Sequence, residues 1–437
     1  MENQDLIIPS LSVSDSGDLY FGSAKIADLV QEYGTPLYLL DENRIRAKCK
    51  AYVTALQAEF GNNCTVYYAS KACSFKGIYQ IIQSEGVGAD VVSCGEIATA
   101  KKAGFNLANA VFHSNNKTDA DIEYAIDNGI GCFCADNEEE LIAIDRIAKQ
   151  KSIVQPVMLR LTPGIDPHTY EAVSTGKVDS KFGSPIETGQ AQHVVELALK
   201  MRNIDLIGFH CHVGSQVFDS DVYQQAIDIM VDFIAKMKND YGFDTRTLDI
   251  GGGFGVRYVA QDPVMDIGAN IALIASKIKS TFAKYGLVVP KICMEPGRSI
   301  VADAGITVYT VGTRKNIIGY KNYVSVDGGM TDNPRFALYG SRYTVFPCNN
   351  FFAPRDMVCS VVGRCCESGD ILQENVALPS NISRGDLICV VSTGAYNYSM
   401  SSNYNRIPRP PIVIVNDGKS KIAVRRETFD DLTALDV

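Results

Sequence analysis

The chain has 437 residues, of which 46% are hydrophobic and 21% are charged, and its net charge is -9 at pH 7. An acidic chain without long runs of one charge is not expected to bind nucleic acid, and no apolar run reaches membrane length. The length exceeds that of one ordinary core, so we expect two or three domains, or one large barrel with a second unit.

The start of the chain and its cysteines bear on location. Residues 1–5 (MENQD) lack the basic start of a signal peptide, so we expect a cytoplasmic protein. The 13 cysteines are an odd number and most lie in apolar runs, which favours free thiols over disulfides. Neither Cys132-Phe133-Cys134 nor Cys365-Cys366 has the spacing of a zinc site, so we assign no metal.

Strand-like and helix-like runs alternate from residue 37 to residue 303, which predicts a parallel sheet. The predicted strands are 66–70, 89–93, 110–113, 131–135, 157–161, 206–213, 247–250 and 291–294. Eight strand–helix units predict a (β/α)8 TIM-like barrel over residues 37–303. A doubly wound sheet usually has fewer strands and a nucleotide fingerprint.

After residue 303 the pattern changes to β-rich runs broken by Gly and Pro, with at most a short helix after Gly394. These runs are 306–311, 323–326, 358–362, 387–391 and 411–415. They predict a second, C-terminal antiparallel β-barrel or sandwich domain over residues 304–437. We expect residues 1–36 to complete this β domain with a strand at Tyr20-Phe21.

Polar residues stand at the carboxyl ends of the predicted barrel strands, where this fold has its active site. They are Lys71, Asp90, His113, Arg160, His210, His212, the glycine run 251–255 and Glu295. An amine at the mouth of an apolar strand is expected to be desolvated, which lowers its pKa and lets it form a Schiff base. The alternative is that Lys71 only reaches for solvent.

The glycine run offers backbone N–H groups without side chains, and the loops after the seventh and eighth strands are the usual phosphate site of a barrel. The alternative is a tight turn. A Schiff-base lysine with a phosphate site suggests pyridoxal phosphate, and Glu295 would then pair with the pyridine nitrogen. Otherwise Glu295 would be the ion-pair partner of a neighbouring arginine.

His210-Cys211-His212 allows three interpretations, because alternation along a strand would put both imidazoles on one face. The pair could hold a metal, although further ligands are scarce among the other three histidines. One ring could instead stack on a flat cofactor. For His210 we favour a hydrogen-bonded core histidine.

Taken together, several motifs are specific. They are 68–72 (YASKA), Asp90 with 93–96 (SCGE), 212–216 (HVGSQ), 251–255 (GGGFG), 295–298 (EPGR), 366–370 (CESGD) and 394–396 (GAY). This set resembles the alanine-racemase-like, fold-type III pyridoxal-phosphate decarboxylases over nearly the whole chain. Within that family the resemblance is to the members that act on meso-2,6-diaminopimelate.

The resemblance implies a barrel, a C-terminal β domain, and a homodimer whose active site forms at the subunit interface. It also implies decarboxylation of meso-2,6-diaminopimelate to L-lysine and carbon dioxide, the last step of lysine biosynthesis. The alternative is a relative that acts on ornithine, D-lysine or carboxynorspermidine. A metal-dependent barrel hydrolase and a non-catalytic homologue are less favoured, because the ligands are few and the motif residues are all present.

The resemblance assigns roles to individual residues. The catalytic residues would be Lys71, which carries the cofactor, His212, which stacks on its ring, and Cys366, which donates a proton from the partner subunit. Cofactor-binding residues would be Lys71, Asp90, His212, Ser215, Gly252, Gly253, Glu295, Gly297, Arg298 and Tyr396. Substrate-binding residues would be Arg298, Arg335, Tyr339, Glu367 and Tyr396.

Substrate choice depends on the far end of the substrate, where diaminopimelate has a carboxylate and an ammonium. By the same resemblance, Arg335 and Tyr339 in the segment 333–339 (NPRFALY) would bind that carboxylate. Glu367 of the partner subunit would bind the ammonium. Phe336 and Cys73 depart from the family pattern, and neither removes a charge. The sequence leaves open whether Cys365 or Cys366 is the reactive thiol, and whether the 165–184 loop moves as a lid.

Overall fold

A computed structural model describes residues 6–165 and 179–437. The chain forms two compact units. The barrel unit consists of Lys48–Gly255 and Met265–Ser299, and the β unit consists of the chain up to Ala47, Val256–Val264 and Ile300–Val437. The units therefore divide the chain at 47/48 and 299/300, with a short excursion at 256–264, whereas the sequence prediction divides it at 36/37 and 303/304.

The barrel unit contains a closed ring of parallel strands, and all the predicted barrel strands are present. In chain order they are β5 (Cys64–Ala69), β6 (Gly88–Val91), β7 (Ala110–Phe112), β8 (Cys132–Ala135), β9 (Gln155–Thr162), β11 (Ile204–His210), β12 (Thr247–Asp249) and β13 (Lys291–Met294). Each strand pairs with its neighbours in parallel, and the ring closes where β13 pairs with β5. A short β10 (Ser184–Pro185) adds to β9. The TIM-like barrel is therefore confirmed.

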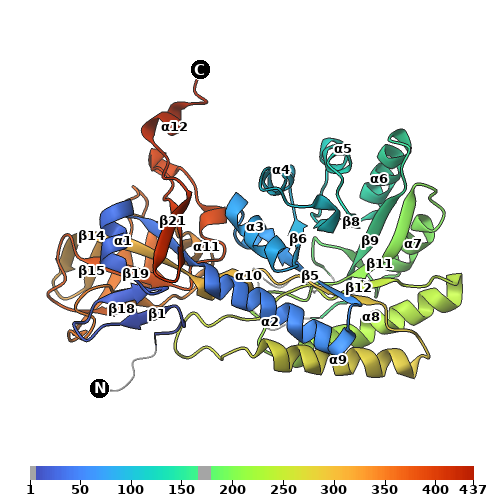
Figure 1. The fold of residues 1–437 in the computed structure, drawn as a ribbon, viewed down its shortest axis with the longest axis horizontal. Helices are drawn as coiled ribbons and strands as arrows, with labels where there is room; N and C mark the ends of the chain where they lie inside the picture. Colours follow the sequence, from blue (N-terminus) through green and yellow to red (C-terminus); the bar gives the residue numbers. More distant parts are fainter. Residues whose placement is uncertain (1–5, 166–178) are drawn as a thin grey trace. The chain divides into compact units, whose positions relative to one another are not determined.

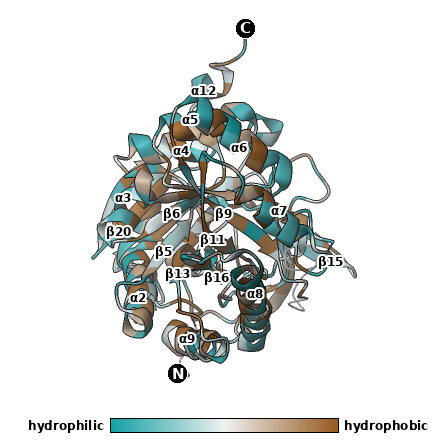
Figure 2. Cartoon of the chain, turned by 90° about the vertical axis from the view of Figure 1, so that its right-hand side faces the viewer, coloured by the Kyte–Doolittle hydropathy of each residue, from teal (hydrophilic) through white to brown (hydrophobic). Residues whose placement is uncertain are grey.

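Helices surround these strands (Figures 1 and 2). They are α2 (Glu42–Phe60), α3 (Lys76–Ser84), α4 (Cys94–Lys102), α5 (Asp119–Asp127), α6 (Glu138–Gln150), α7 (Gln190–Ala198), α8 (Ser220–Tyr241) and α9 (Ile267–Lys284). Helix α8 shows why they form: Val222, Ala226, Met230 and other buried residues recur every three or four positions. The apolar stripe covers the strands, and polar positions face water.

Part of the barrel interior is filled by side chains from neighbouring strands. Val111, Cys132, Cys134 and Met158 form one buried cluster there. Cys132 and Cys134 are free, as predicted, and burial raises the pKa of Cys132 to about 12. These thiols act as small apolar side chains.

The β unit is built around a second sheet, of strand order β18-β17-β15-β14-β4-β20-β21, to which β19 and β16 are added beside β14. Its strands are β4 (Leu37–Asp41), β14 (Gly305–Ile317), β15 (Lys321–Val326), β16 (Val345–Pro347), β17 (Met357–Val362), β18 (Ile371–Leu378), β19 (Leu387–Val391), β20 (Ile412–Asn416) and β21 (Lys419–Val424). Most pairings are antiparallel, but β4–β20 and β15–β17 are parallel. The predicted β domain is thus present, with a mixed rather than a wholly antiparallel sheet, because long connections separate the strands of both parallel pairs.

The N-terminal segment differs from the expectation in one respect. Tyr20 and Phe21 lie in β2 (Leu19–Phe21), which pairs with β1 (Leu11–Val13) and β3 (Ala24–Lys25) in a separate three-stranded sheet. The strand that joins the main sheet of the β unit is β4, which lies between β14 and β20. The N-terminal sheet and α1 (Ile26–Tyr33) share the apolar core of the β unit.

The remaining helices are short. They are α10 (Arg298–Val301), α11 (Arg335–Tyr339) and α12 (Phe429–Thr433). Among residues 6–165 and 179–437, no helix combines the length and the apolar character needed to cross a membrane.

Candidate active site

The polar residues predicted at the strand ends lie at the carboxyl ends of the barrel strands. Lys71 is in a 3-10 turn (Ser70–Ala72) directly after β5, and Glu295 directly follows β13. His113 follows β7, and the glycine run begins two residues after β12. The closed ring of strands therefore brings these polar residues together at one end of the barrel, as predicted.

The turn that carries Lys71 is fixed by its neighbour Ser70. The hydroxyl of Ser70 is buried and lies 2.8 Å from the carboxylate of Glu96 and 2.8 Å from the carbonyl oxygen of Asp90. Glu96 belongs to the first turn of α4 and also accepts from the amide of Val92. The Ser93–Glu96 motif is therefore a helix start that positions the lysine turn. Lys71 itself is an exposed residue.

Glu295 lies buried between two imidazoles. Its Oε1 is 2.6 Å from Nε2 of His113, and its Oε2 is 3.1 Å from Nε2 of His210. Burial opposes ionisation, but the two histidines outweigh it and hold the pKa of Glu295 well below its usual range. The carboxylate is therefore charged and held in a fixed direction. No arginine is its partner among the described residues.

The two histidines of the 210–212 motif have different surroundings. Strand β11 ends at His210, so the alternation assumed from the sequence stops before His212. Two groups of described residues that could ligate a metal contain His210, one with His113 and Cys134 and one with Asp249 and Glu295. A third consists of Asp90, His113 and Glu295, and His212 is in none of the three. None of these groups combines the two histidines of the motif, and His210 is the hydrogen-bonded core histidine that we favoured.

His212 lies against the glycine turn. A Cβ on Gly251 would come within 2.8 Å of Nδ1 of His212. Burial, together with the positive charges of Lys71 and Arg160, lowers the pKa of His212 well below its usual value. The imidazole is therefore neutral, which suits a ring that packs flat against another ring.

Glycine is required at consecutive positions of the run after β12. A Cβ on Gly252 would lie 2.2 Å from the carbonyl oxygen of Glu295, and a Cβ on Gly253 would lie 2.3 Å from that of Gly214. Gly253 also has a φ of +110°. The amide of Gly251 donates to Asp249, whereas no described residue accepts from the amides of Gly252 and Gly253.

The loop after β11 meets the start of α10 at two predicted ligand residues. Nε and Nη2 of Arg298 lie 3.1 Å and 3.0 Å from Oγ of Ser215. Arg298 is buried, so its positive charge lies in the interior, next to Ser215. Gly297, just before it, has no room for a side chain because a Cβ there would lie 2.9 Å from Ala69.

Two buried acids lie close to Glu295. One is Asp90, which the sequence analysis names as a site residue. Burial raises the pKa of Asp90 to about 6. The other is Asp249, which the sequence analysis did not name. Burial and the charge of Glu295 raise the pKa of Asp249 well above its usual value. Its Oδ1 accepts from the amide of Gly251 at 2.8 Å. A carboxyl group in the apolar strand Thr247–Asp249 was the sequence signal that could have revealed it.

The β unit holds a second group of predicted residues. Arg335 begins α11, is buried, and places its guanidinium 5.3 Å from the ring centroids of both Tyr339 and Tyr396. Its Nη2 donates to Ser341 at 3.3 Å, and its Nε has no hydrogen-bond partner among residues 6–165 and 179–437. No carboxylate of the described residues pairs with Arg335. Arg335 is therefore a buried cation whose described neighbours are two aromatic rings and a hydroxyl group.

The two neighbouring cysteines differ in environment. Cys366 is exposed, whereas Cys365 is half-buried, and burial and the charge of Asp370 raise the pKa of Cys365 to about 12. Asp370 anchors this loop by accepting from the amides of Met330 and Cys365 at 2.6 Å and 2.7 Å. Glu367 is exposed beside them and accepts from the amide of Gly369.

The predicted lid over residues 165–184 lies mostly outside the described residues, which resume at Asp179. Its C-terminal end is held to the barrel. The amide of Gly183 donates to Asp136 at 2.9 Å, and the hydroxyl of Thr162 donates to the carbonyl oxygen of Phe182 at 2.6 Å. The guanidinium of Arg160 lies 4.4 Å from the ring centroid of Phe182.

Residues 42–302 match the family of pyridoxal-dependent decarboxylases over its pyridoxal-binding domain. The chain is 41% identical over 425 residues to a diaminopimelate decarboxylase of Halalkalibacterium halodurans, which covers 97% of this chain and 96% of that protein. It is 40% identical to the diaminopimelate decarboxylase of Bacillus subtilis, over 96% of this chain and 95% of that one.

Solved structures agree with these relatives. A diaminopimelate decarboxylase of M. jannaschii in complex with L-lysine has a TM-score of 0.90 and 31% identity, and the match covers 98% of both chains. A lysine/ornithine decarboxylase of Vibrio vulnificus in complex with putrescine has a TM-score of 0.75 and 26% identity, over 90% of this chain and 97% of that one.

Proposed function

The chain belongs to the diaminopimelate decarboxylases, and from that membership we propose which of its residues carry out the reaction. The reaction removes a carboxylate from meso-2,6-diaminopimelate and yields L-lysine and carbon dioxide in lysine biosynthesis. The cofactor is pyridoxal phosphate, which when bound supplies an electron sink for the bond that loses carbon dioxide.

The end of the barrel fits this cofactor. Lys71 would bind it covalently, and the ionised Glu295 would accept from its ring nitrogen. The neutral His212 would lie on the ring, and Asp90 would contribute to the polar surroundings. The two histidines beside Glu295 support its role because they keep the carboxylate charged and oriented.

The phosphate would bind where the two loops and α10 meet. The amides of Gly252 and Gly253 and the hydroxyl of Ser215 are the donors there, and Arg298 supplies the nearest positive charge. We place Gly297 and Tyr396 among the cofactor-binding residues as well. The contact of Arg298 with Ser215 supports a role at the phosphate more than at the far end of the substrate.

The observation that carries the substrate proposal is the buried guanidinium of Arg335 between Tyr339 and Tyr396. Diaminopimelate has a second carboxylate, and ornithine and lysine do not, so an arginine without an acidic partner favours the former. Tyr339 would share the distal carboxylate with Arg335, and Tyr396 would contact the substrate beside them. Glu367 would take the distal ammonium.

We also propose a homodimer with the active site at the subunit interface, in which the partner subunit's Cys366 is the proton donor. The exposure of Cys366 and the raised pKa of Cys365 support that choice of thiol. We place the protein in the cytoplasm, where its free cysteines would stay reduced.

Substrate kinetics with Arg335→Ala test the substrate proposal. We expect KM for meso-2,6-diaminopimelate to rise about 10- to 100-fold with little change in kcat, because one charge-assisted contact is lost. Arg384→Ala is the control, since Arg384 is exposed and its guanidinium donates to the carbonyl oxygen of Gly312. Decarboxylation of ornithine or lysine by the unaltered enzyme at a similar rate would favour the amine-forming relatives instead.

A further inference from the structure

Two loops at the end of the barrel are joined by backbone hydrogen bonds. The amide of Val217 donates to the carbonyl oxygen of Gly253, and the amide of Gly255 donates to that of Val217, both at 2.9 Å. A parallel bridge links Val217 to Phe254. These contacts fasten the loop that carries Ser215 to the glycine run.

A buried tyrosine donates a hydrogen bond to the glycine run. The hydroxyl of Tyr223, in the first turn of α8, donates to the carbonyl oxygen of Gly252 at 2.9 Å. Burial raises the pKa of Tyr223 well above its usual value, so the hydroxyl keeps its proton and remains a donor. A Cβ on Gly253 would lie 2.8 Å from the hydroxyl oxygen of Tyr223, so only glycine fits at position 253.

The direction of one peptide group follows from this hydrogen bond. A trans peptide is planar, and its C=O and N–H point to opposite sides. Because Tyr223 binds the carbonyl of Gly252, the amide of Gly253 in the same peptide group points away from Tyr223. No residue of the described chain accepts a hydrogen bond from that amide.

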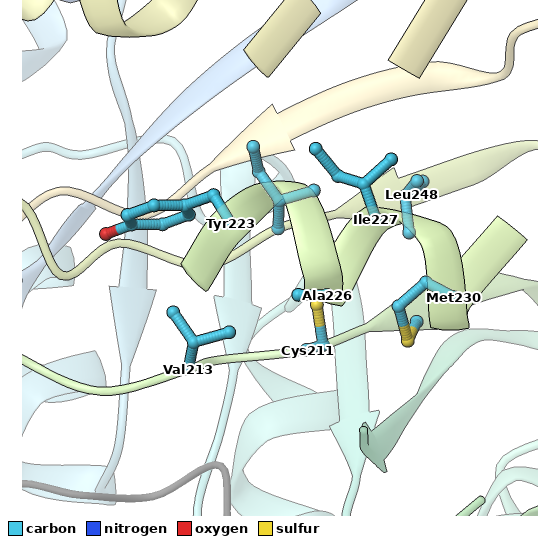
Figure 3. Close-up of a pocket in the computed structure, with 8 residues that line it drawn as sticks. Cys211, Val213, Tyr223, Ala226, Ile227, Met230 and Leu248 are labelled. Carbon is cyan, nitrogen blue, oxygen red and sulfur yellow. The ribbon is translucent and has the colours of Figure 1, made fainter. Parts of the chain in front are cut away.

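The ring of Tyr223 has neighbours that keep it in place. It meets the ring of Phe254 edge to face, with centroids 5.3 Å apart. On its other side lies a small apolar cavity, also lined by Cys211, Val213, Ala226 and Met230. Figure 3 shows the hydroxyl of Tyr223 directed away from Ala226 and Met230. Among the described residues, the hydroxyl of Tyr223 therefore has its hydrogen-bond partner at the glycine run.

We propose that Tyr223 is a positioning residue for cofactor binding, whose hydroxyl orients the Gly252–Gly253 peptide toward the phosphate group of the cofactor. The inference rests on the proposed placement of the phosphate at Gly252, Gly253 and Ser215. The proposal assigns a function to Tyr223, which lies 29 positions before Gly252 in the sequence.

The test compares two ligands of the apoenzyme, pyridoxal phosphate and pyridoxal, which lacks the phosphate. In Tyr223→Phe the ring and its contact with Phe254 remain, and only the hydroxyl is lost. We expect the Kd for pyridoxal phosphate, measured by absorbance titration, to rise about fivefold, as for one hydrogen bond. The Kd for pyridoxal should not change.

Tyr285→Phe is the control, because it also removes one tyrosine hydroxyl, which donates to Asp232 on the outside of the barrel unit. It should leave both Kd values unchanged. An equal loss of affinity for both ligands in Tyr223→Phe would mean a general effect on folding and would overturn the inference. Unchanged affinity for both would overturn it as well.

Gly253→Ala separates this inference from the proposal beneath it. A Cβ there meets the carbonyl oxygen of Gly214 at 2.3 Å, so the variant should lose the preference for pyridoxal phosphate over pyridoxal. If Gly253→Ala keeps that preference, the placement of the phosphate is wrong. If it loses the preference and Tyr223→Phe does not, only the role of Tyr223 is wrong.

Discussion

Oε1 of Glu295 lies 2.6 Å from Nε2 of His113 in the interior of the barrel unit. His210 holds the other oxygen of the same carboxylate, so Glu295 cannot turn without breaking two contacts. In the proposed site such a carboxylate would be pre-organised for the ring nitrogen of the cofactor, because the two contacts fix its direction.

Glu295→Gln should lower kcat/KM about 10- to 100-fold, since the amide removes the charge that pairs with the ring nitrogen. Release of carbon dioxide at saturating cofactor measures the effect, and absorbance checks that the cofactor is bound. Glu196→Gln serves as the control because Glu196 pairs with Lys200 on the surface. Full activity of Glu295→Gln at full cofactor occupancy would contradict the role of Glu295.

The sequence predicted the barrel well because its parallel strands are short apolar runs separated by amphipathic helices. It did not predict the place of β4 (Leu37–Asp41), whose five residues are all buried. An inner strand of one sheet and a barrel strand are equally apolar, so composition does not distinguish them. The pairing with β14 and β20 depends on residues more than 260 positions away.

The candidate site shows the same limit. Charged residues at strand ends, such as Lys71 and Glu295, could be found because the fold places all strand ends together. Tyr223 could not, since helical periodicity marks it only as a core residue and says nothing of its hydroxyl partner. The link between His113 and Glu295 joins residues 182 positions apart and is likewise visible only in three dimensions.

The two neighbouring cysteines should react differently with iodoacetamide. Cys366 is exposed, whereas Cys365 holds its proton because burial and Asp370 raise its pKa to about 12. We therefore expect Cys366 to be alkylated first at pH 8, and bound L-lysine to slow the reaction. Mass spectrometry of the peptide that contains both residues measures the two sites.

The matched pair of variants tests the catalytic role of the thiol. Cys366→Ser should lower kcat by about 100-fold or more, as for the loss of a general acid, and Cys365→Ser should retain most activity. Faster alkylation of Cys365, or equal activity of the two variants, would contradict the assignment of Cys366.

The ion pair between Lys117 and Glu140 is buried, with side-chain exposures of 0% and 3%. Lys117 also donates to the carbonyl oxygens of Ser114 and Cys134, so it ties together the ends of β7 and β8. Lys117→Met should lower the free energy of unfolding by about 3–5 kcal/mol, because Glu140 is left as an unpaired buried charge. Urea unfolding measures the change.

The double variant Lys117→Met with Glu140→Leu removes both charges and should recover much of the lost stability. An exposed pair, Lys200 with Glu196, gives the comparison: its lysine variant should change stability by less than about 1 kcal/mol. If Lys117→Met were as mild as the surface variant, the buried pair would not be a structural tie.

Asp332 is a buried acid of the β unit that holds a proton near neutral pH. Burial raises its pKa to about 7, while the hydroxyl of Tyr309 donates to its Oδ1 and the amide of Gly329 donates to its Oδ2. The unfolded chain would release this proton near the ordinary value of 3.8. The folded chain therefore binds one more proton than the unfolded chain between about pH 4 and pH 7.

The free energy of unfolding should therefore fall as the pH rises through that window, by up to about 4 kcal/mol for this one group. Asp332→Asn cannot titrate, so its stability relative to the unaltered protein should rise between pH 4 and pH 7 and stay constant above it. Urea unfolding at several pH values measures this difference. Asp356→Asn is the control of opposite sign: hydrogen bonds from Ser380 lower the pKa of Asp356, so its effect should appear only below about pH 4. A difference between Asp332→Asn and the unaltered protein that does not vary with pH would show that Asp332 is already ionised in the fold.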